Sequence, residues 1–154
     1  MNNYLAAVAL AAVLGQPAAA VTFPSLTTIY VGSGVRDNGG AGGVGTATVF
    51  HCTNVSGVSA SVRYLVLNPV GQVSASTTIT LPHGQTRTAA THNTAAYFED
   101  PLLATGLVEQ GAVNIESTQS GLFCSAMTID AAAASPIGVP LRLIRINPHP
   151  GSVE

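Results

Sequence analysis

The stretch Gly111–Asp130, GAVNIESTQSGLFCSAMTID, contains the pattern on which the rest of the chain depends. Two runs rich in β-branched and apolar residues, Ala112–Ser117 and Leu122–Ile129, flank the polar sequence Thr118–Gly121. A short polar turn with glycine between two strand-like runs is typical of a β-hairpin. We therefore predict a hairpin at the centre of the fold, with Cys124 on its second strand.

The N-terminus has the pattern of an export signal. Leu5–Leu14 is an uninterrupted apolar run, shorter than the about 20 residues that span a bilayer. The small residues Ala18–Ala20 follow, which suits signal peptidase. Because Met1–Tyr4 lacks the usual Lys or Arg, an uncleaved membrane anchor is the alternative. We predict a signal peptide over residues 1–20 and an exported protein, periplasmic or extracellular.

The predicted export affects how the two cysteines are interpreted. Cys52 lies in the apolar run Thr46–Asn54, far upstream of Cys124. In an oxidising compartment an even pair of cysteines favours a disulfide. Closing a loop of this length contributes roughly 4 kcal/mol to stability in the chain-entropy model. We predict a buried Cys52–Cys124 bridge; two buried free thiols are the alternative.

The composition points to a single domain with a nearly uncharged surface. Charged residues make up 8% of the 154 residues, against roughly 25% in a typical soluble domain. There is no lysine, and the net charge is −2, so the sequence predicts neither nucleic-acid binding nor attraction to an anionic membrane after signal cleavage. Because charge repulsion hardly opposes association, a homo-oligomer is the expectation and a neutral monomeric domain the alternative.

The rest of the mature chain is a series of short strand-like runs separated by turns. Apart from the central pair, the runs are Thr27–Gly32, Thr46–Asn54, Ser59–Asn68, Val73–Leu81, Gln85–Thr91 and Leu141–Asn147. The connecting segments include a glycine-rich loop at Ser33–Gly45, an irregular or briefly helical Glu99–Leu107, and a linker at Ala131–Pro140. Such a pattern predicts an all-β fold, a single antiparallel β-sandwich of seven or eight strands of the immunoglobulin-like kind over residues 21–147. A polar tail follows at residues 148–154.

Several of these segments carry a resemblance to known proteins. The succession HCTN, SVRYLVLN, TITLPHGQT, NIESTQSGLFCSA and RINPHPGSVE resembles short exported bacterial proteins that have no assigned function. Between Thr46 and Asp130 the pattern is also similar to the β-sandwich of sensory-rhodopsin transducers. The resemblance implies a fold and no catalytic residue, and the transducers' partner is not carried over because they lack an export signal.

The sequence contains literal matches to cofactor and metal motifs, but each match lacks a feature that the motif requires. Gly40–Gly45, GAGGVG, matches a dinucleotide-binding motif literally, but a strand-like run follows it where a helix is required. The spacing Cys124-x-x-Met127 has the outline of a blue-copper site but lacks the histidine between the two ligands. The sequence therefore predicts no catalytic, cofactor or metal residue.

Two alternatives to a non-catalytic module stay open. A metal site or an active site assembled from dispersed residues has the candidates His51, His83, His92, Glu99 and Glu116. The three T-x-T steps Thr46–Thr48, Thr78–Thr80 and Thr86–Thr88 would form a flat ligand-binding surface if they lay in register.

The favoured hypothesis is an exported, non-enzymatic β-sandwich that works by self-association or by binding a protein or cell-surface partner. The last run, LRLIRIN, is apolar on both faces, and a terminal strand usually lies at a sheet edge, where unpaired backbone groups invite pairing. Only Arg142 and Arg145 would guard that edge. The apolar segment Val21–Leu26 would add a strand to a neighbour in the same way.

Overall fold

The computed structural model describes residues 25–39 and 42–146, so the predicted signal peptide and polar tail lie outside the described residues. The described chain forms nine strands. In chain order they are β1 (Thr27–Asp37), β2 (Thr46–Asn54), β3 (Ala60–Leu67), β4 (Val73–Leu81), β5 (Thr86–Ala90), β6 (Val108–Ser117), β7 (Leu122–Asp130), β8 (Val139–Leu141) and β9 (Leu143–Arg145).

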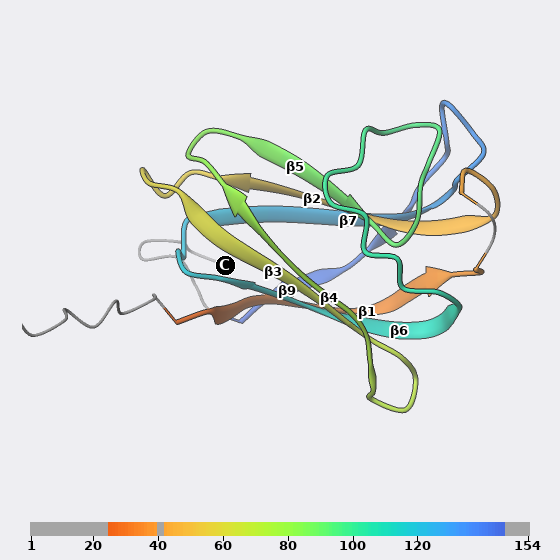
Figure 1. Cartoon of the computed structure of the whole chain (residues 1–154), viewed down its shortest axis with the longest axis horizontal. Coiled ribbons are helices and arrows are strands. Elements are labelled where there is room, and N and C mark those ends of the chain that lie inside the picture. Colours follow the sequence, from red (N-terminus) through yellow and green to blue (C-terminus); the bar gives the residue numbers. More distant parts are fainter. Residues whose placement is uncertain (1–24, 40–41, 147–154) are drawn as a thin grey trace, which may run out of the picture.

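The strands form two antiparallel sheets packed face to face (Figure 1), which confirms the predicted sandwich. One sheet has five strands in the order β4-β3-β6-β1-β9, and the other has four in the order β5-β2-β7-β8. The chain crosses between the sheets several times, so strands that are distant in sequence, such as β1 and β6, become neighbours. No helix in residues 25–39 and 42–146 is long and apolar enough to cross a membrane.

The core lies between the sheets and follows the two-residue period of the strands. On β3 every second residue is fully buried, from Ala60 to Val66, and Tyr64 of this series packs near Phe50 of β2 with ring centroids 6.1 Å apart. Val113 and Ile115 of β6 complete the five-stranded side. Since these side chains alternate with exposed or half-buried ones, the pattern of apolar residues decides which face of each strand turns inward.

The predicted disulfide joins two neighbouring strands of the four-stranded sheet. Cys52 of β2 and Cys124 of β7 are directly opposed in register, with Cα atoms 4.2 Å apart, and close a sequence separation of 72. Cys52 is fully buried whereas Cys124 is half-buried, so the predicted burial of the bridge is correct for Cys52 and only partial for Cys124. A disulfide of this kind indicates an oxidising environment outside the cytoplasm.

The prediction of a central hairpin is wrong. β6 lies between β3 and β1 in the five-stranded sheet, whereas β7 lies between β2 and β8 in the other. The turn at Thr118–Gly121 therefore carries the chain from one sheet to the other. A turn motif indicates that the chain changes direction, but it does not show whether the two flanking strands pair with each other.

The first strand is longer than predicted. The predicted strand ends at Gly32, whereas β1 continues to Asp37. Val35 and Asp37 still pair with β6, across register shifts on either side of Val35. Gly34, with φ of 94°, adopts a backbone conformation that other residues rarely take, and so accommodates the irregular pairing. The predicted glycine-rich loop is correspondingly shorter at its start.

The predicted final strand Leu141–Asn147 is two strands in different sheets. β8 begins at Val139, inside the predicted linker, and pairs with β7, whereas β9 pairs with β1. Arg142 lies at the crossing between them. This is why the structure has nine strands where seven or eight were predicted, and why each of the last two is only three residues long.

The segment between β5 and β6 covers the outer face of the four-stranded sheet (Figure 1). It has no helix, and its Ala96 and Tyr97 pack on a second small cluster formed by Val49, Ala90 and Ile129. β2 is therefore covered on both faces, which explains why its apolar residues do not alternate cleanly.

Candidate functional site

The structure does not bring together the five residues that the sequence offered for a metal or active site. His51 lies on the outer face of the four-stranded sheet, His83 in the turn after β4, His92 at the end of the sandwich, Glu99 in the covering segment and Glu116 on the outer face of the five-stranded sheet. Within the described part of the chain, no three His, Cys, Asp or Glu side chains lie close enough to hold a metal ion.

Four of these residues have local partners that account for their positions. His51 Nδ1 is 3.0 Å from Thr88 Oγ1, and burial lowers the pKa of His51. His83 Nδ1 accepts a hydrogen bond of 3.0 Å from the backbone of Gly57. Glu99 accepts hydrogen bonds from the backbone and hydroxyl of Thr94, and Glu116 forms an ion pair with Arg63. These contacts hold turns and strands together.

His92 belongs to a buried cluster that the sequence did not indicate. Its Nδ1 lies 3.0 Å from Oδ1 of Asp37, a carboxylate that is only 1% exposed. Its Nε2 lies 3.0 Å from the carbonyl oxygen of Val44. Both ring nitrogens of His92 therefore lie within 3.0 Å of an oxygen atom of a neighbouring segment.

Asp37 receives further hydrogen bonds in the same cluster. The backbone N–H of Gly39 donates at 2.7 Å and the hydroxyl of Thr105 at 2.9 Å. Burial by itself would raise the pKa of Asp37, but the contact with His92 and the hydrogen bonds from Gly39 and Thr105 outweigh it and lower the pKa below its ordinary value. The cluster connects the end of β1 with the loop between β1 and β2 and with the segment between β5 and β6. Its polar groups are directed at one another.

The three threonine steps do not share a surface. Thr78 and Thr80 are exposed on the five-stranded sheet, opposite Arg63 and Ser61 of β3. Thr86 and Thr88 lie on the outer face of the other sheet, where Thr86 contacts Thr53 at 2.7 Å between hydroxyl oxygens. Thr48 is fully buried and bonds to the backbone of Arg36. The hypothesis of one flat threonine surface is therefore wrong.

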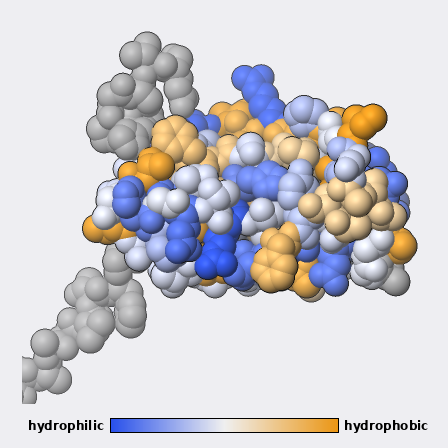
Figure 2. Space-filling model, turned by 90° about the horizontal axis from the view of Figure 1, so that it is seen from above, coloured by the Kyte–Doolittle hydropathy of each residue, from blue (hydrophilic) through white to orange (hydrophobic). Residues whose placement is uncertain are grey.

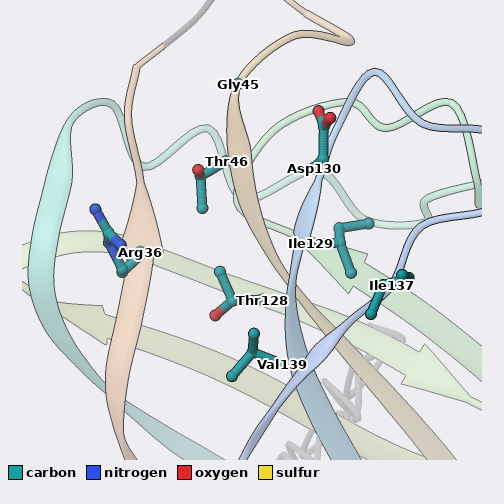
Figure 3. A pocket seen from close by; sticks show the side chains of 8 residues that line it. All are labelled: Arg36, Gly45, Thr46, Thr128, Ile129, Asp130, Ile137 and Val139. Carbon is teal, nitrogen blue, oxygen red and sulfur yellow. The ribbon is translucent and has the colours of Figure 1, made fainter.

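A groove opens along the side of the sandwich, between β1 and the β7–β8 pair (Figure 3). Its volume is about 500 Å³. In Figure 3, Arg36 stands on the β1 side and Asp130 on β7, with Thr46 and Thr128 between them. The lining residues are Arg36, Gly45, Thr46, Thr128, Ile129, Asp130, Ile137 and Val139. We call this the lateral groove.

The lateral groove forms where the edge of the five-stranded sheet lacks a described pairing strand. β9 pairs with β1 only at Tyr30–Gly32, so the second half of β1 has no strand on that side among the described residues. A second hollow of about 300 Å³ shares Arg36, Thr128 and Val139 with the groove and extends it towards Ser33. The result is an elongated depression with hydroxyl groups in its floor and apolar side chains on its β8 side.

The chemistry of the lateral groove fits binding better than catalysis. It contains one guanidinium and one carboxylate, with two hydroxyls between, and neither a histidine nor a cysteine. Nucleophilic catalysis requires a base within hydrogen-bond reach of the nucleophile. Asp130 instead accepts a hydrogen bond of 3.0 Å from the backbone of Ala132. The side chains that line the groove therefore form no pair of nucleophile and base.

The sequence did not single out the lateral groove. The sequence pattern places Arg36 in a glycine-rich loop, and Ile137 and Val139 in a small-residue linker, since no periodic pattern marks either stretch. Thr46 is predicted as the first residue of a strand and as part of a threonine step, without a link to the other lining residues. No local sequence signal marks the groove, because its residues come from separate segments that meet only when the strands pair.

The chain matches no family model, no curated protein and no solved structure.

Proposed function

We propose that this chain is an exported, non-catalytic β-sandwich module that works by association, with itself or with a protein or cell-surface partner in the periplasm or outside the cell. The proposal rests on how the few charged side chains are used. Most of them are held by partners within the chain, which leaves a surface of hydroxyl, amide and apolar groups.

The charge pairs are distributed over both sheets. Arg63 pairs with Glu116 on the five-stranded sheet, and Arg87 pairs with Asp100 beside the other. Arg145 donates to the carbonyl oxygens of Ser120 and Leu122. The two ion pairs are internally neutral and the net charge of the chain is −2, so little charge repulsion keeps two molecules apart.

Apolar side chains are exposed in several places at the same time. Phe98 is 91% exposed, Ile137 96% and Val70 77%. On the face shown in Figure 2, hydrophobic residues lie in several separate groups among hydrophilic ones. Scattered apolar residues are normal on a protein surface. In combination with so few free charges they favour contact with other molecules.

The test is sedimentation of the protein purified from the exported fraction, over a wide concentration range and at low and high salt, together with binding to the surface of the producing cells. We expect concentration-dependent association or cell-surface binding that changes little with salt, because few charges take part. A monomer at the highest concentration that also fails to bind the cells would overturn the proposal. Metal analysis of the same sample tests the alternative of a site built from the dispersed histidines.

A further inference from the structure

Four strands lie at sheet edges, and three of these edges are blocked. β5 is covered by the following segment, where Thr88 accepts a hydrogen bond from Asp100 at 2.8 Å and Ala90 accepts one from Leu103 at 2.8 Å. β8 has only three residues, and one of them, Pro140, has no N–H to donate. β9 also has three residues. Short strands, proline and covering loops are the usual means of preventing edge-to-edge pairing.

β4 is the exception. It is a nine-residue edge strand that pairs with β3 without interruption from Ala60–Leu81 to Val66–Ala75. No described strand pairs with its other side. Its sequence, VSASTTITL, contains no charged residue and no proline. A long, regular and uncharged edge is a template for another strand.

The sequence of β4 is self-complementary when read antiparallel about Thr77. Ala75 would then face Ile79 on the side of the core, and Val73, which is 59% exposed and lies beyond a register shift at the start of β4, would be opposite Leu81. On the outer side Ser74 and Ser76 would face Thr80 and Thr78, so hydroxyls meet hydroxyls. This register pairs every residue of the strand, and no like charges meet in it.

We propose that two copies of this chain pair antiparallel through β4, about a two-fold axis at Thr77, and so join their five-stranded sheets into one continuous sheet. This inference rests on the association function proposed above and names a second copy as the partner. The sequence pattern favours the C-terminal run LRLIRIN as the pairing edge. We place the pairing on β4 instead, because β8 and β9 are too short to offer a comparable row of backbone groups.

A charge placed on β4 tests the interface. Ser76 is exposed and faces Leu65 of β3, so Ser76→Lys adds a lysine without touching the Arg63–Glu116 pair. Like charges on paired edges oppose association, and we expect the dimer dissociation constant to rise by at least about tenfold. Ile144→Lys is the matched control, because Ile144 is 51% exposed on the other edge of the same sheet. Circular dichroism checks that both variants fold.

The register has its own test, which also serves if Ser76→Lys does not fold. Thr77→Cys places two thiols opposite each other at the two-fold axis, within disulfide reach. Ser74→Cys places the two thiols roughly 20 Å apart in the same register. Under oxidising conditions we expect an intermolecular disulfide in the first variant and none in the second.

The outcomes separate this inference from the proposed function. Loss of association in Ser76→Lys but not in Ile144→Lys, with cross-linking at residue 77 alone, supports pairing through β4. Dissociation by Ile144→Lys alone, or cross-linking at residue 74, overturns pairing through β4 while association stands. A wild-type monomer at all concentrations also overturns it, and the association function then depends on the cell-binding measurement alone.

Discussion

At the scale of single residues, the hydroxyl of Tyr64 is an unusual feature of the core. Tyr64 is fully buried, and its oxygen has no hydrogen-bond partner among the described residues. Burial raises the pKa of this hydroxyl because the charged form is desolvated. Since a buried polar group without a partner costs free energy, Tyr64 is a place where the core is not optimal.

Tyr64→Phe should therefore stabilise the protein. Removing the hydroxyl keeps the ring that packs near Phe50 and relieves the desolvation cost, so we expect a gain of about 1 kcal/mol in the free energy of unfolding. Urea unfolding monitored by circular dichroism measures it. Tyr30→Phe is the opposite control: the hydroxyl of Tyr30 donates to the carbonyl of Leu122 at 3.0 Å, and its loss should destabilise. A loss of stability in Tyr64→Phe would contradict the expectation.

Asp37 gives the protein a dependence on acidic pH. Its pKa in the folded state is lowered below 3.8, so the carboxylate contributes stability above that value, and the contribution is lost as the pH falls through the folded pKa. We expect Asp37→Asn to reduce the free energy of unfolding by about 1–3 kcal/mol near neutral pH. The difference from wild type should shrink as the pH falls through the folded pKa of Asp37, because protonation makes this side chain neutral like that of Asn. Unfolding curves at several pH values test this, and an equal difference at all pH values would contradict it.

At the scale of elements, the cross-sheet turn is held by the last described strand. Arg145 of β9 reaches the carbonyl of Leu122 at 2.7 Å and the hydroxyl of Tyr30 at 2.7 Å. Its guanidinium also lies 5.2 Å from the centroid of the Tyr30 ring. The turn between β6 and β7 thus depends on a strand that is adjacent to it only in space.

Arg145→Ala should loosen this connection. The carbonyl oxygens of Ser120 and Leu122 and the hydroxyl of Tyr30 would lose a charged donor at a half-buried site, and we expect a loss of about 2 kcal/mol in the free energy of unfolding. Arg142→Ala is the matched control, since Arg142 is an exposed neighbour and such surface changes usually stay within about 0.5 kcal/mol. Denaturant unfolding of both variants measures the difference. Equal effects of the two substitutions would show that the turn does not depend on Arg145.

At the scale of the whole molecule, the two halves of the chain are joined covalently by one bridge. Intact mass of the exported protein tests this bridge and the predicted processing together. We expect a chain that begins near Val21, and no alkylation of Cys52 or Cys124 without reductant. Reduction should then expose both thiols and lower stability by roughly 4 kcal/mol in the chain-entropy model. Alkylation of both thiols in the native, unreduced protein would contradict the bridge, and a retained residue 1 would contradict the predicted cleavage.

The sequence by itself determined the class of fold and most of the strands. Strands such as β2, β3, β4 and β7 could be located within a residue or two, because their β-branched residues follow a local period and their turns contain proline or glycine. The cysteine pairing could also be predicted, because two cysteines allow one intramolecular bridge. These features depend on neighbours in the chain.

Only the tertiary structure decided which strands pair. The turn at Thr118–Gly121 looks the same whether it closes a hairpin or crosses between sheets, and the split of the last strand at Arg142 has no local signal. The lateral groove and the Asp37–His92 cluster arise from segments that meet after the sheets have formed. Long-range pairing is set by the combined burial of all strands, which no single stretch of sequence encodes.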